Sequence, residues 1–298
     1  MAYALVLASG KPSAKKSAFP LRQICGWFSG FISAPVRVSF KEIDNGLLLY
    51  IITMPHPEIY RIKNRTGKRL TIKKWIKAVK SNNIEKYLLE KPLKEYMEGE
   101  WAADGDGYIA ESIRRNMHLL FSMEPLRSLE MREMTVTLSG IKKQYIRPNL
   151  MTLLRNFRLV NVIGSDAEMD DIWDEFMAET GVPVCITGDF AVLSRSHVWI
   201  LYDEKDIDYP FNGIKIAACE KNIIYPKYSR QYRIGYAFSR KLLKKLGVTL
   251  VQRFNNQLLA EFLLNMVINK KDISIAEAEE LLGVKISILS AESLSLYS

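Results

Sequence analysis

The stretch from Phe157 to Asp203 reads FRLVNVIGSD (157–166), AEMDDIWDEFMAETG (167–181) and VPVCITGDF (182–190), and after a short turn HVWILYD (197–203). The first, third and fourth pieces are short apolar runs rich in Val and Ile, which is typical of buried strands. The second piece places apolar residues at helical spacing. A strand, a helix and two more strands in this order predict a parallel sheet, whose loops meet at one edge where ligands bind.

Length and charge divide the chain into two parts. A chain of 298 residues favours roughly two domains. Residues 1–150 hold 25 Lys and Arg against 14 Asp and Glu, a net of +11, whereas residues 151–298 hold 17 against 19, a net of −2. We therefore expect an α/β protein with a smaller, basic N-terminal α+β domain (1–150), followed by a domain with a Rossmann-like parallel sheet and C-terminal helices (151–298).

The remaining elements are predicted from apolar spacing and turn residues. Strands are expected at 3–8, at 36–40 and 47–54 as an antiparallel pair, near 60–62 and 70–72, and at 134–140, 211–219 and 248–254. Helices are expected from about 71, at 83–97 and 108–123, from a first turn at Pro148, and at 228–246, 257–268 and 274–283.

The loop after the first strand of the quoted stretch departs from a dinucleotide-binding turn. Gly164 is its only glycine, and Ser165 and Asp166 follow where further glycines would allow backbone amides to contact a pyrophosphate. Up to four carboxylates lie in the first turns of the helix, where they repel phosphate or simply stabilise the helix dipole. They are Asp166, Glu168, Asp170 and Asp171.

Asp189 is the leading single candidate for a binding residue. It closes the second strand, 25 positions after Gly164, near where such sheets place a carboxylate that holds ribose hydroxyls. The alternative is a structural Asp in a Gly-Asp turn. The expected site consists of the three loops at Gly164, Ser165 and Asp166, at Gly188, Asp189 and Phe190, and at Asp203. A nucleoside-like or phosphate-poor ligand, such as an adenosyl group, fits this combination.

The block from Arg158 to about Arg253 resembles the cofactor domains of the glutamyl-tRNA reductase and shikimate dehydrogenase type. In those domains a strand ends in Gly-Ser or Gly-Ala, and a second strand led by proline follows. The resemblance implies NADPH and a carbonyl substrate, but the phosphate-binding glycines match only at Gly164. The catalytic Lys, Asp or Cys positions of those families have no counterpart in residues 1–150.

No catalytic residue or metal site emerges from the sequence. Three cysteines and three histidines are present, without zinc-ligand spacing. Ser194, Ser196 and His197 lack a third group to orient the imidazole, so Ser194 is expected to cap a turn. The apolar segments are too short to span a bilayer and no signal peptide is recognised, which favours a cytoplasmic protein without membrane contact.

A basic run marks the N-terminal half. Residues 61–80 contain nine cations and no acidic residue, a composition suited to phosphate backbones but also to a solvated face or an acidic partner. Six of these cations form the candidate nucleic-acid surface: Arg65, Lys68, Arg69, Lys73, Lys74 and Lys77.

The sequence supports two hypotheses about function, and a purely structural role is the third alternative. The first is a protein that binds a nucleotide-like or nucleoside-like ligand, such as NAD(P) or an adenosyl group, and is a candidate divergent NAD(P)-type oxidoreductase lacking the glycine fingerprint. The second is a nucleic-acid-binding or regulatory protein that uses the basic run.

Overall fold

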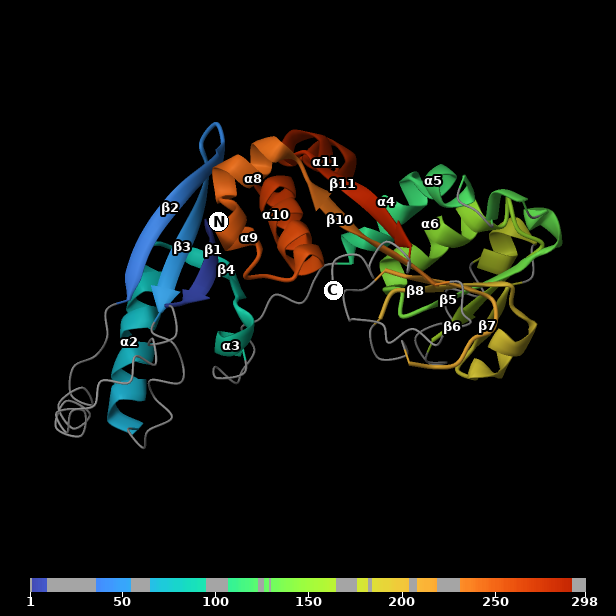
Figure 1. The fold of residues 1–298 in the computed structure, drawn as a ribbon, viewed down its shortest axis with the longest axis horizontal. Helices are drawn as coiled ribbons and strands as arrows, with labels where there is room; N and C mark the ends of the chain where they lie inside the picture. Colours follow the sequence, from blue (N-terminus) through green and yellow to red (C-terminus); the bar gives the residue numbers. More distant parts are fainter. Residues whose placement is uncertain are drawn as a thin grey trace. The chain divides into compact units, whose positions relative to one another are not determined.

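The computed structural model describes residues 2–9, 36–54, 65–94, 107–122, 126–128, 130–164, 176–181, 184–203, 208–218 and 231–290. The chain forms two compact units, each made of two separate stretches of sequence (Figure 1). Unit 1 contains Met1–Asp106 and Ser239–Ser274, and unit 2 contains Gly107–Phe238 and Ile275–Ser298. This division differs from the boundary expected at residue 150, since strands from both sides of it share one sheet in unit 2.

Unit 1 is built on a four-stranded sheet in the order β2-β3-β1-β4. Its strands are β1 (Ala2–Ala8), β2 (Arg37–Asp44), β3 (Leu47–Met54) and β4 (Ile84–Leu89). β1 pairs in parallel with both β3 and β4, whereas β2 and β3 form an antiparallel hairpin, as the sequence predicts. β1 is almost wholly apolar because it is buried on both faces.

Helices cover both faces of β1. On one face, Trp75 of α2 (Arg65–Ser81) meets Tyr87 of β4 edge to face, with ring centroids 5.2 Å apart. On the other, Phe262 of α10 (Asn256–Lys271) packs against Tyr3, whose hydroxyl donates a 2.9 Å hydrogen bond to Asn265 Oδ1. Unit 1 is completed by α3 (Lys91–Lys94), α8 (Arg240–Leu246) and α9 (Val248–Val251).

Charged groups attach the second stretch of unit 1, Ser239–Ser274, to this sheet. The carboxylate of Glu90 accepts hydrogen bonds from the amide of Ala8 at 2.6 Å and from Nε and Nη2 of Arg253 at 2.9 and 2.6 Å. Arg253 Nη2 also donates to the carbonyl of Ala8. Lys271 of α10 pairs with Asp44 of β2 at 2.5 Å. Residues distant in sequence are thereby joined into one unit.

Unit 2 contains a seven-stranded sheet in the order β11-β10-β9-β8-β5-β6-β7. The strands are β5 (Thr135–Ser139), β6 (Leu159–Ile163), β7 (Cys185–Thr187), β8 (Val198–Leu201), β9 (Ile214–Ala217), β10 (Gln231–Phe238) and β11 (Val284–Ser290). All neighbours pair in parallel except β10 and β11, which are antiparallel. The first six strands follow the 3-2-1-4-5-6 order of a doubly wound, Rossmann-like sheet, which confirms the expected fold class.

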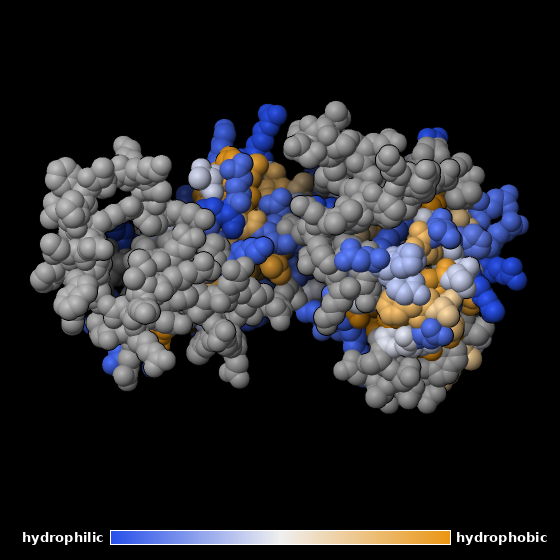
Figure 2. All heavy atoms as spheres, turned by 60° about the horizontal axis from the view of Figure 1, so that its bottom comes forward, coloured by the Kyte–Doolittle hydropathy of each residue, from blue (hydrophilic) through white to orange (hydrophobic). Residues whose placement is uncertain are grey.

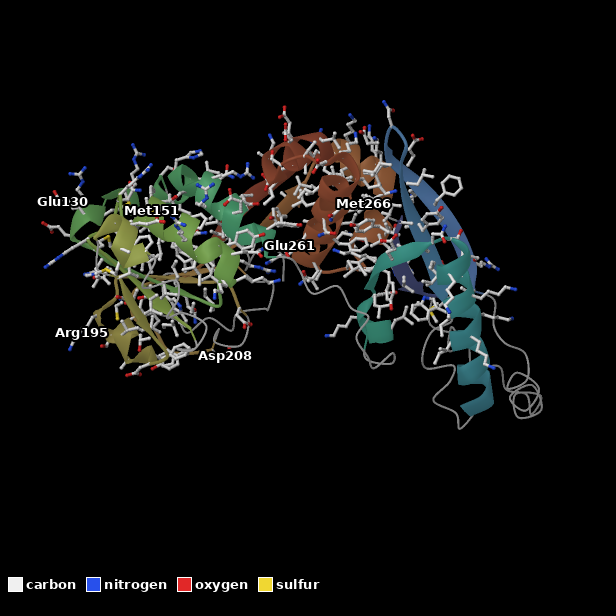
Figure 3. All side chains as sticks on the ribbon, turned by 180° about the vertical axis from the view of Figure 1, so that it is seen from behind. Glu130, Met151, Arg195, Asp208, Glu261 and Met266 are labelled. Atoms are coloured by element: carbon white, nitrogen blue, oxygen red, sulfur yellow. The ribbon has the colours of Figure 1, made fainter. Side chains whose placement is uncertain are left out.

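The two faces of this sheet are covered differently. α6 (Lys143–Leu153) lies over one face, together with α4 (Tyr108–Arg115) and α5 (Met117–Phe121). The other face carries only a six-residue 3-10 helix, η4 (Phe190–Arg195), and the segment 208–213 within the described part of the chain. In Figure 3, Met151 of α6 and Arg195 of η4 mark the two opposite faces.

A buried polar cluster joins α4 to β10 and α11 (Ile275–Leu282). The fully buried hydroxyl of Ser112 hydrogen-bonds to the hydroxyl of Tyr236 at 2.9 Å and donates to Glu279, which also pairs with Arg115. The helix expected at 274–283 is confirmed, and β11 follows it. Unit 2 also contains the short 3-10 helices η2 (Leu126–Ser128) and η3 (Met131–Glu133).

Several local predictions are wrong. The segments 83–97 and 228–246, expected as helices, contain the strands β4 and β10, and α9 replaces the strand expected at 248–254. α2 includes residues 65–72, where a turn and a strand were expected, and Pro148 lies inside α6, not in its first turn. The helix expected in 167–180 lies outside the described residues except for 176–180, which are helical. None of the described helices is both long and apolar enough to cross a bilayer.

Candidate functional site

The order of the strands places a switch point between β5 and β8. From β5 the chain adds β6 and β7 on one side of the sheet, and the strands from β8 onward are added on the other side. In open α/β sheets, ligands bind outside the carboxyl ends of the strands where the order reverses in this way. The candidate site of unit 2 is therefore the edge formed by the ends of β5 and β8.

Gly140 brings the two strand ends close together. It directly follows β5 and has a φ of +68°. A Cβ atom at this position would lie 2.4 Å from Cβ and 2.5 Å from the backbone nitrogen of Asp203, which follows β8. No residue with a side chain fits in this space, so the backbone of the turn after β5 lies directly against the loop after β8.

Tyr202 fixes the position of α6 relative to this turn. Its backbone amide donates to the carbonyl of Ser139 at 2.9 Å, and its hydroxyl donates to Oδ1 of Asn149 in α6 at 3.4 Å. Asn149 is fully buried and donates from Nδ2 to the carbonyl of Tyr145 at 2.8 Å. Burial of the hydroxyl raises the pKa of Tyr202, so it remains a neutral hydrogen-bonding group.

The N-terminus of α6 lies at this edge and carries positively charged side chains. Lys142 occupies the N-cap position and makes no side-chain cap, and the first turn contains no acidic residue. Lys142 and Lys143 are both exposed. Because the amides of a helix N-terminus carry partial positive charge, two lysines beside them favour an anion.

Glycines extend along the same edge. Gly140, Gly164 and Gly188 directly follow β5, β6 and β7, and the residues before them are paired in one row of the sheet. Gly164 donates from its amide to the carbonyl of Thr187 at 3.1 Å. The structure thus brings three of the predicted positions, Gly164, Gly188 and Asp203, to one edge of the sheet.

Other predicted positions lie elsewhere or have other contacts. The carboxylate of Asp189 accepts the amide of Ala191 at 2.8 Å and caps η4, which is the contact expected of a structural Asp in a turn. Phe190 belongs to η4 and packs over Trp199, with ring centroids 6.4 Å apart. Ser165 and Asp166 lie outside the described residues.

The turn at Gly164, where the sequence predicts a poor environment for phosphate, is not the turn at the switch point. The acidic segment 166–171 follows β6, which is the second strand of the sheet, and the first strand is β5. The turn after β5 contains Gly140, Lys142 and Lys143, which sequence reasoning missed. In the sequence, this turn is marked by the apolar run 134–140, which ends in glycine before a helix. Only the strand order shows that this run is the first strand of the sheet.

The histidine and serines considered in the sequence have local structural partners. His197 Nδ1 accepts the amide of Thr135 at 3.1 Å, and Ser194 donates to the carbonyl of Ala191 at 2.7 Å, as expected for a turn. Within the described ranges, no three His, Cys, Asp or Glu side chains lie close enough to hold a metal ion.

Comparison of the sequence with family models and with curated proteins finds no match. Solved structures with a similar arrangement include a chorismate mutase/shikimate 5-dehydrogenase fusion protein from Clostridium acetobutylicum (12% identity, TM-score 0.33, 99% of this chain and 98% of that chain). They also include quinate dehydrogenase from Corynebacterium glutamicum in complex with NAD (8%, TM-score 0.32, 94% and 98%) and glutamyl-tRNA reductase from Methanopyrus kandleri (15%, TM-score 0.26, 65% and 44%). The two families that the sequence resembles are thus among the matches. At these TM-scores the fold assignment depends on the sheet topology and not on the matches.

Proposed function

We propose that unit 2 binds a phosphate-containing nucleotide at the carboxyl ends of β5 and β8, with the phosphates at the N-terminus of α6. The observation that carries this proposal is the strand order, which makes the turn at Gly140 the first strand-to-helix turn of a doubly wound sheet. NAD or NADP is the ligand class that sheets with this order commonly hold at that turn.

The residues present fit such a group. Because residue 140 is a glycine, it places no side chain of its own between a ligand and the amides at the start of α6, and the neighbouring side chain at this turn is that of Asp203. Lys142 and Lys143 supply charge, and a helix N-terminus contributes about 0.3–1 kcal/mol to holding a nearby anion. The turn has one glycine where dinucleotide-binding turns have three, so the phosphates contact a lysine-bearing turn instead of a glycine-rich one.

Thermal shift measurements on the full chain test this proposal. NAD, NADP and ADP are expected to stabilise the protein, by about 2.7 kcal/mol at a hundredfold excess over Kd, whereas adenosine without phosphate stabilises it far less. Lys142→Gln with Lys143→Gln is expected to weaken binding of the phosphate-bearing ligands about tenfold. Arg155→Gln with Arg158→Gln removes two exposed charges near the other end of α6 and serves as the matched control.

Two results would contradict the proposal. One is the absence of stabilisation by any of the three phosphate-bearing ligands. The other is an equal effect of both double variants, since that would show a dependence on net charge and not on the turn after β5.

A second candidate function rests on α2 in unit 1. This 17-residue helix contains seven Lys or Arg and no acidic residue. Lys73, Lys74, Lys77 and Lys80 are exposed, while Trp75 between them is buried and fixes the helix on its sheet. We propose that this face binds the phosphate backbone of a nucleic acid, where contacts by several cations give a steep dependence on salt.

Fluorescence anisotropy with a labelled single-stranded and a double-stranded oligonucleotide tests this second function. Binding is expected to fall steeply between 50 and 200 mM salt, by roughly ten- to a thousandfold for the few contacts available on one helix. Lys73→Glu with Lys77→Glu is expected to abolish it, whereas Lys241→Glu with Lys244→Glu on α8 of the same unit leaves it nearly unchanged. Binding that is absent, or unaffected by both salt and the α2 substitutions, rejects this function.

A further inference from the structure

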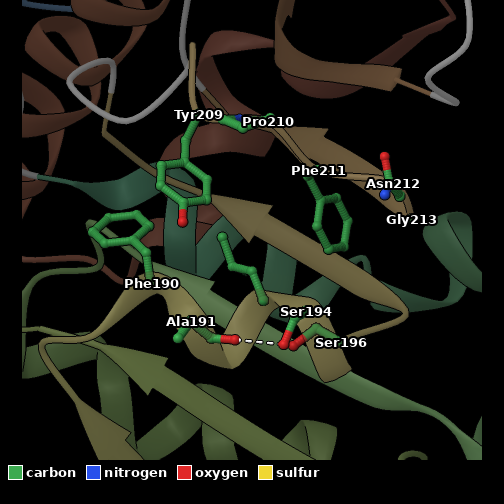
Figure 4. A pocket seen from close by; sticks show the side chains of 10 residues that line it. Phe190, Ala191, Ser194, Ser196, Tyr209, Pro210, Phe211, Asn212 and Gly213 are labelled. Carbon is green, nitrogen blue, oxygen red and sulfur yellow. Dashed lines mark hydrogen bonds between the residues drawn. The ribbon is translucent and has the colours of Figure 1, made fainter.

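A hollow of about 310 Å³ lies on the face of the unit 2 sheet that η4 covers (Figure 4). Its lining includes Phe190, Ser194, Ser196, Tyr209, Phe211 and Asn212. In the close-up, Tyr209 and Phe190 lie on one side, Phe211 lies across from them, and the two serines lie below the rings in this view. Hydrophobic residues reach the surface of unit 2 on the right of Figure 2, and Tyr209 is 41% exposed.

Among the described residues, this face has less covering than a doubly wound sheet usually has. Such a sheet carries helices on both faces, but here a short 3-10 helix and the segment 208–213 cover the second face over the described residues. Beneath them, Trp199 is fully buried and meets Phe211 edge to face, with ring centroids 5.6 Å apart. The aromatic rings are thus held by a rigid base in the sheet.

This hollow is separate from the switch point. Ser196 and Gly213 line it, and they come shortly before β8 and β9, so this end of it lies at the amino ends of the strands. Gly140 follows the carboxyl end of β5, at the opposite edge of the same sheet. The end of the hollow at Ser196 and Gly213 is therefore distinct from the turn at Gly140.

The lining is uncharged and aromatic. None of the ten lining residues, all within the described ranges, has a charged side chain. An ionised ligand would lose hydration without gaining an ion pair, which disfavours phosphates and carboxylates. Phe190 and Tyr209 lie 4.8 Å apart at 35°, and such rings pack favourably against the face or edge of a further flat ring.

The two serines of the lining offer acceptors and not donors. Ser194 donates its hydroxyl proton to the carbonyl of Ala191 at 2.7 Å, and Ser196 donates to the carbonyl of Val192 at 3.0 Å. Ser196 is further paired with the hydroxyl of Thr137 at 2.5 Å, which fixes its position. With their protons already used, the oxygens are available to accept a hydrogen bond, and Ser194, which is exposed, offers the more accessible one.

From these observations we infer that the hollow binds a neutral, flat aromatic or heteroaromatic molecule that donates a hydrogen bond from one end to Ser194. The size fits two fused rings, since a cavity of about 150 Å³ holds benzene and this hollow is roughly twice as large.

Indole and benzofuran form a matched pair of probes, because they share their shape but only indole has an N–H donor. Titration of the full chain, followed by calorimetry or ligand-observed NMR, is expected to show indole binding about five times more tightly than benzofuran, the size of one neutral hydrogen bond. Absence of binding by either probe overturns the inference. Equal affinity for both overturns the assignment of Ser194 as the acceptor.

Two variants locate the binding. Ser194→Ala is expected to remove the preference for indole, whereas Ser122→Ala is the control, because Ser122 is exposed in the same unit and makes the same kind of bond, to the carbonyl of Leu119 at 2.8 Å. Ala191→Trp fills the hollow and is expected to abolish binding of both probes. Binding of both probes unchanged in Ser194→Ala and Ala191→Trp places them elsewhere on the chain and rejects the proposed site.

Discussion

Replacement of Gly140 by alanine tests the geometry on which the switch-point site depends. A positive φ costs a residue with a side chain about 1–2 kcal/mol. At Gly140 the new methyl group would also lie 2.4 Å from Cβ of Asp203 and 2.5 Å from its backbone nitrogen. Backbone cannot rotate away as a flexible side chain does, so overpacking adds about 1–3 kcal/mol. We expect Gly140→Ala to destabilise unit 2 by about 2–5 kcal/mol.

Gly181→Ala is the matched control for this substitution. Gly181 lies in the same unit and has a φ of +62°, but nothing lies within 4 Å of the added Cβ atom. The control therefore carries the conformational cost without the steric one. Urea unfolding, with amide hydrogen exchange of the β5 and β8 peptides to report on unit 2, measures both variants. A Gly140→Ala cost no larger than that of Gly181→Ala would refute the close approach of the two strand ends.

Three further substitutions test charged contacts that stabilise unit 1 or unit 2 from within. Glu90→Ala is expected to cost unit 1 about 2–4 kcal/mol, because it removes the carboxylate that pairs with the partly buried Arg253 and accepts from the amide of Ala8, and urea unfolding with a double-mutant cycle measures it. Glu279→Ala is expected to cost unit 2 a similar amount by removing the carboxylate that accepts from the buried Ser112 and pairs with Arg115, which amide hydrogen exchange in α4 and α11 detects. The hydrogen bond from its lysine partner holds the pKa of Asp44 below the ordinary value of 3.8, so the stability it contributes is present above that value and lost as pH falls below it. Asp44→Asn is therefore expected to cost at most about 1 kcal/mol at pH 7 and nothing near pH 2, measured by unfolding at both pH values.

The strands of unit 2 that could be predicted from sequence are those whose burial is complete. β6, β8 and β9 are short, mainly apolar runs, interrupted only by Asn161 and Lys215, which are themselves buried, because a central parallel strand is covered on both faces and leaves no position for exposed polar residues. The hairpin of β2 and β3 was equally predictable from the sequence, since Asn45 and Gly46 form the turn and Gly46 has a positive φ of 74°.

Strands with a mixed pattern were misassigned for a physical reason. In β10, Ile234 and Tyr236 are buried and Ala237 is exposed, so the true period is two, but the basic segment that follows extends an apparent helix. Ser239 marks the actual start of α8, where its hydroxyl accepts the amide of Leu242 at 3.2 Å. β4 is a strand because it pairs with β1, about eighty residues earlier, and no local signal reports that partner.

The site was only partly predictable because strand order is not a local property. The sequence indicates which residues follow strands, and it placed Gly164, Gly188 and Asp203 at a common edge. It does not indicate that β8 lies beside β5, and this pairing alone moves the switch point from Gly164 to Gly140. Only that pairing shows that the two lysines at the start of α6 lie at the switch point.

The two proposed sites of unit 2 use opposite chemistry, and salt distinguishes them. At the carboxyl edge, glycines at 140, 164 and 188 leave backbone and helix dipole as the contacts, with Lys142 supplying charge, so binding there is electrostatic. In the hollow, uncharged rings give binding by burial of apolar surface, which salt does not screen. Raising the salt concentration from 50 to 500 mM is therefore expected to weaken nucleotide binding and leave indole binding unchanged or slightly tighter. A parallel loss of both would mean that the two ligands share one charged site, which would contradict the assignment of the nucleotide to the turn at Gly140 and of indole to the hollow.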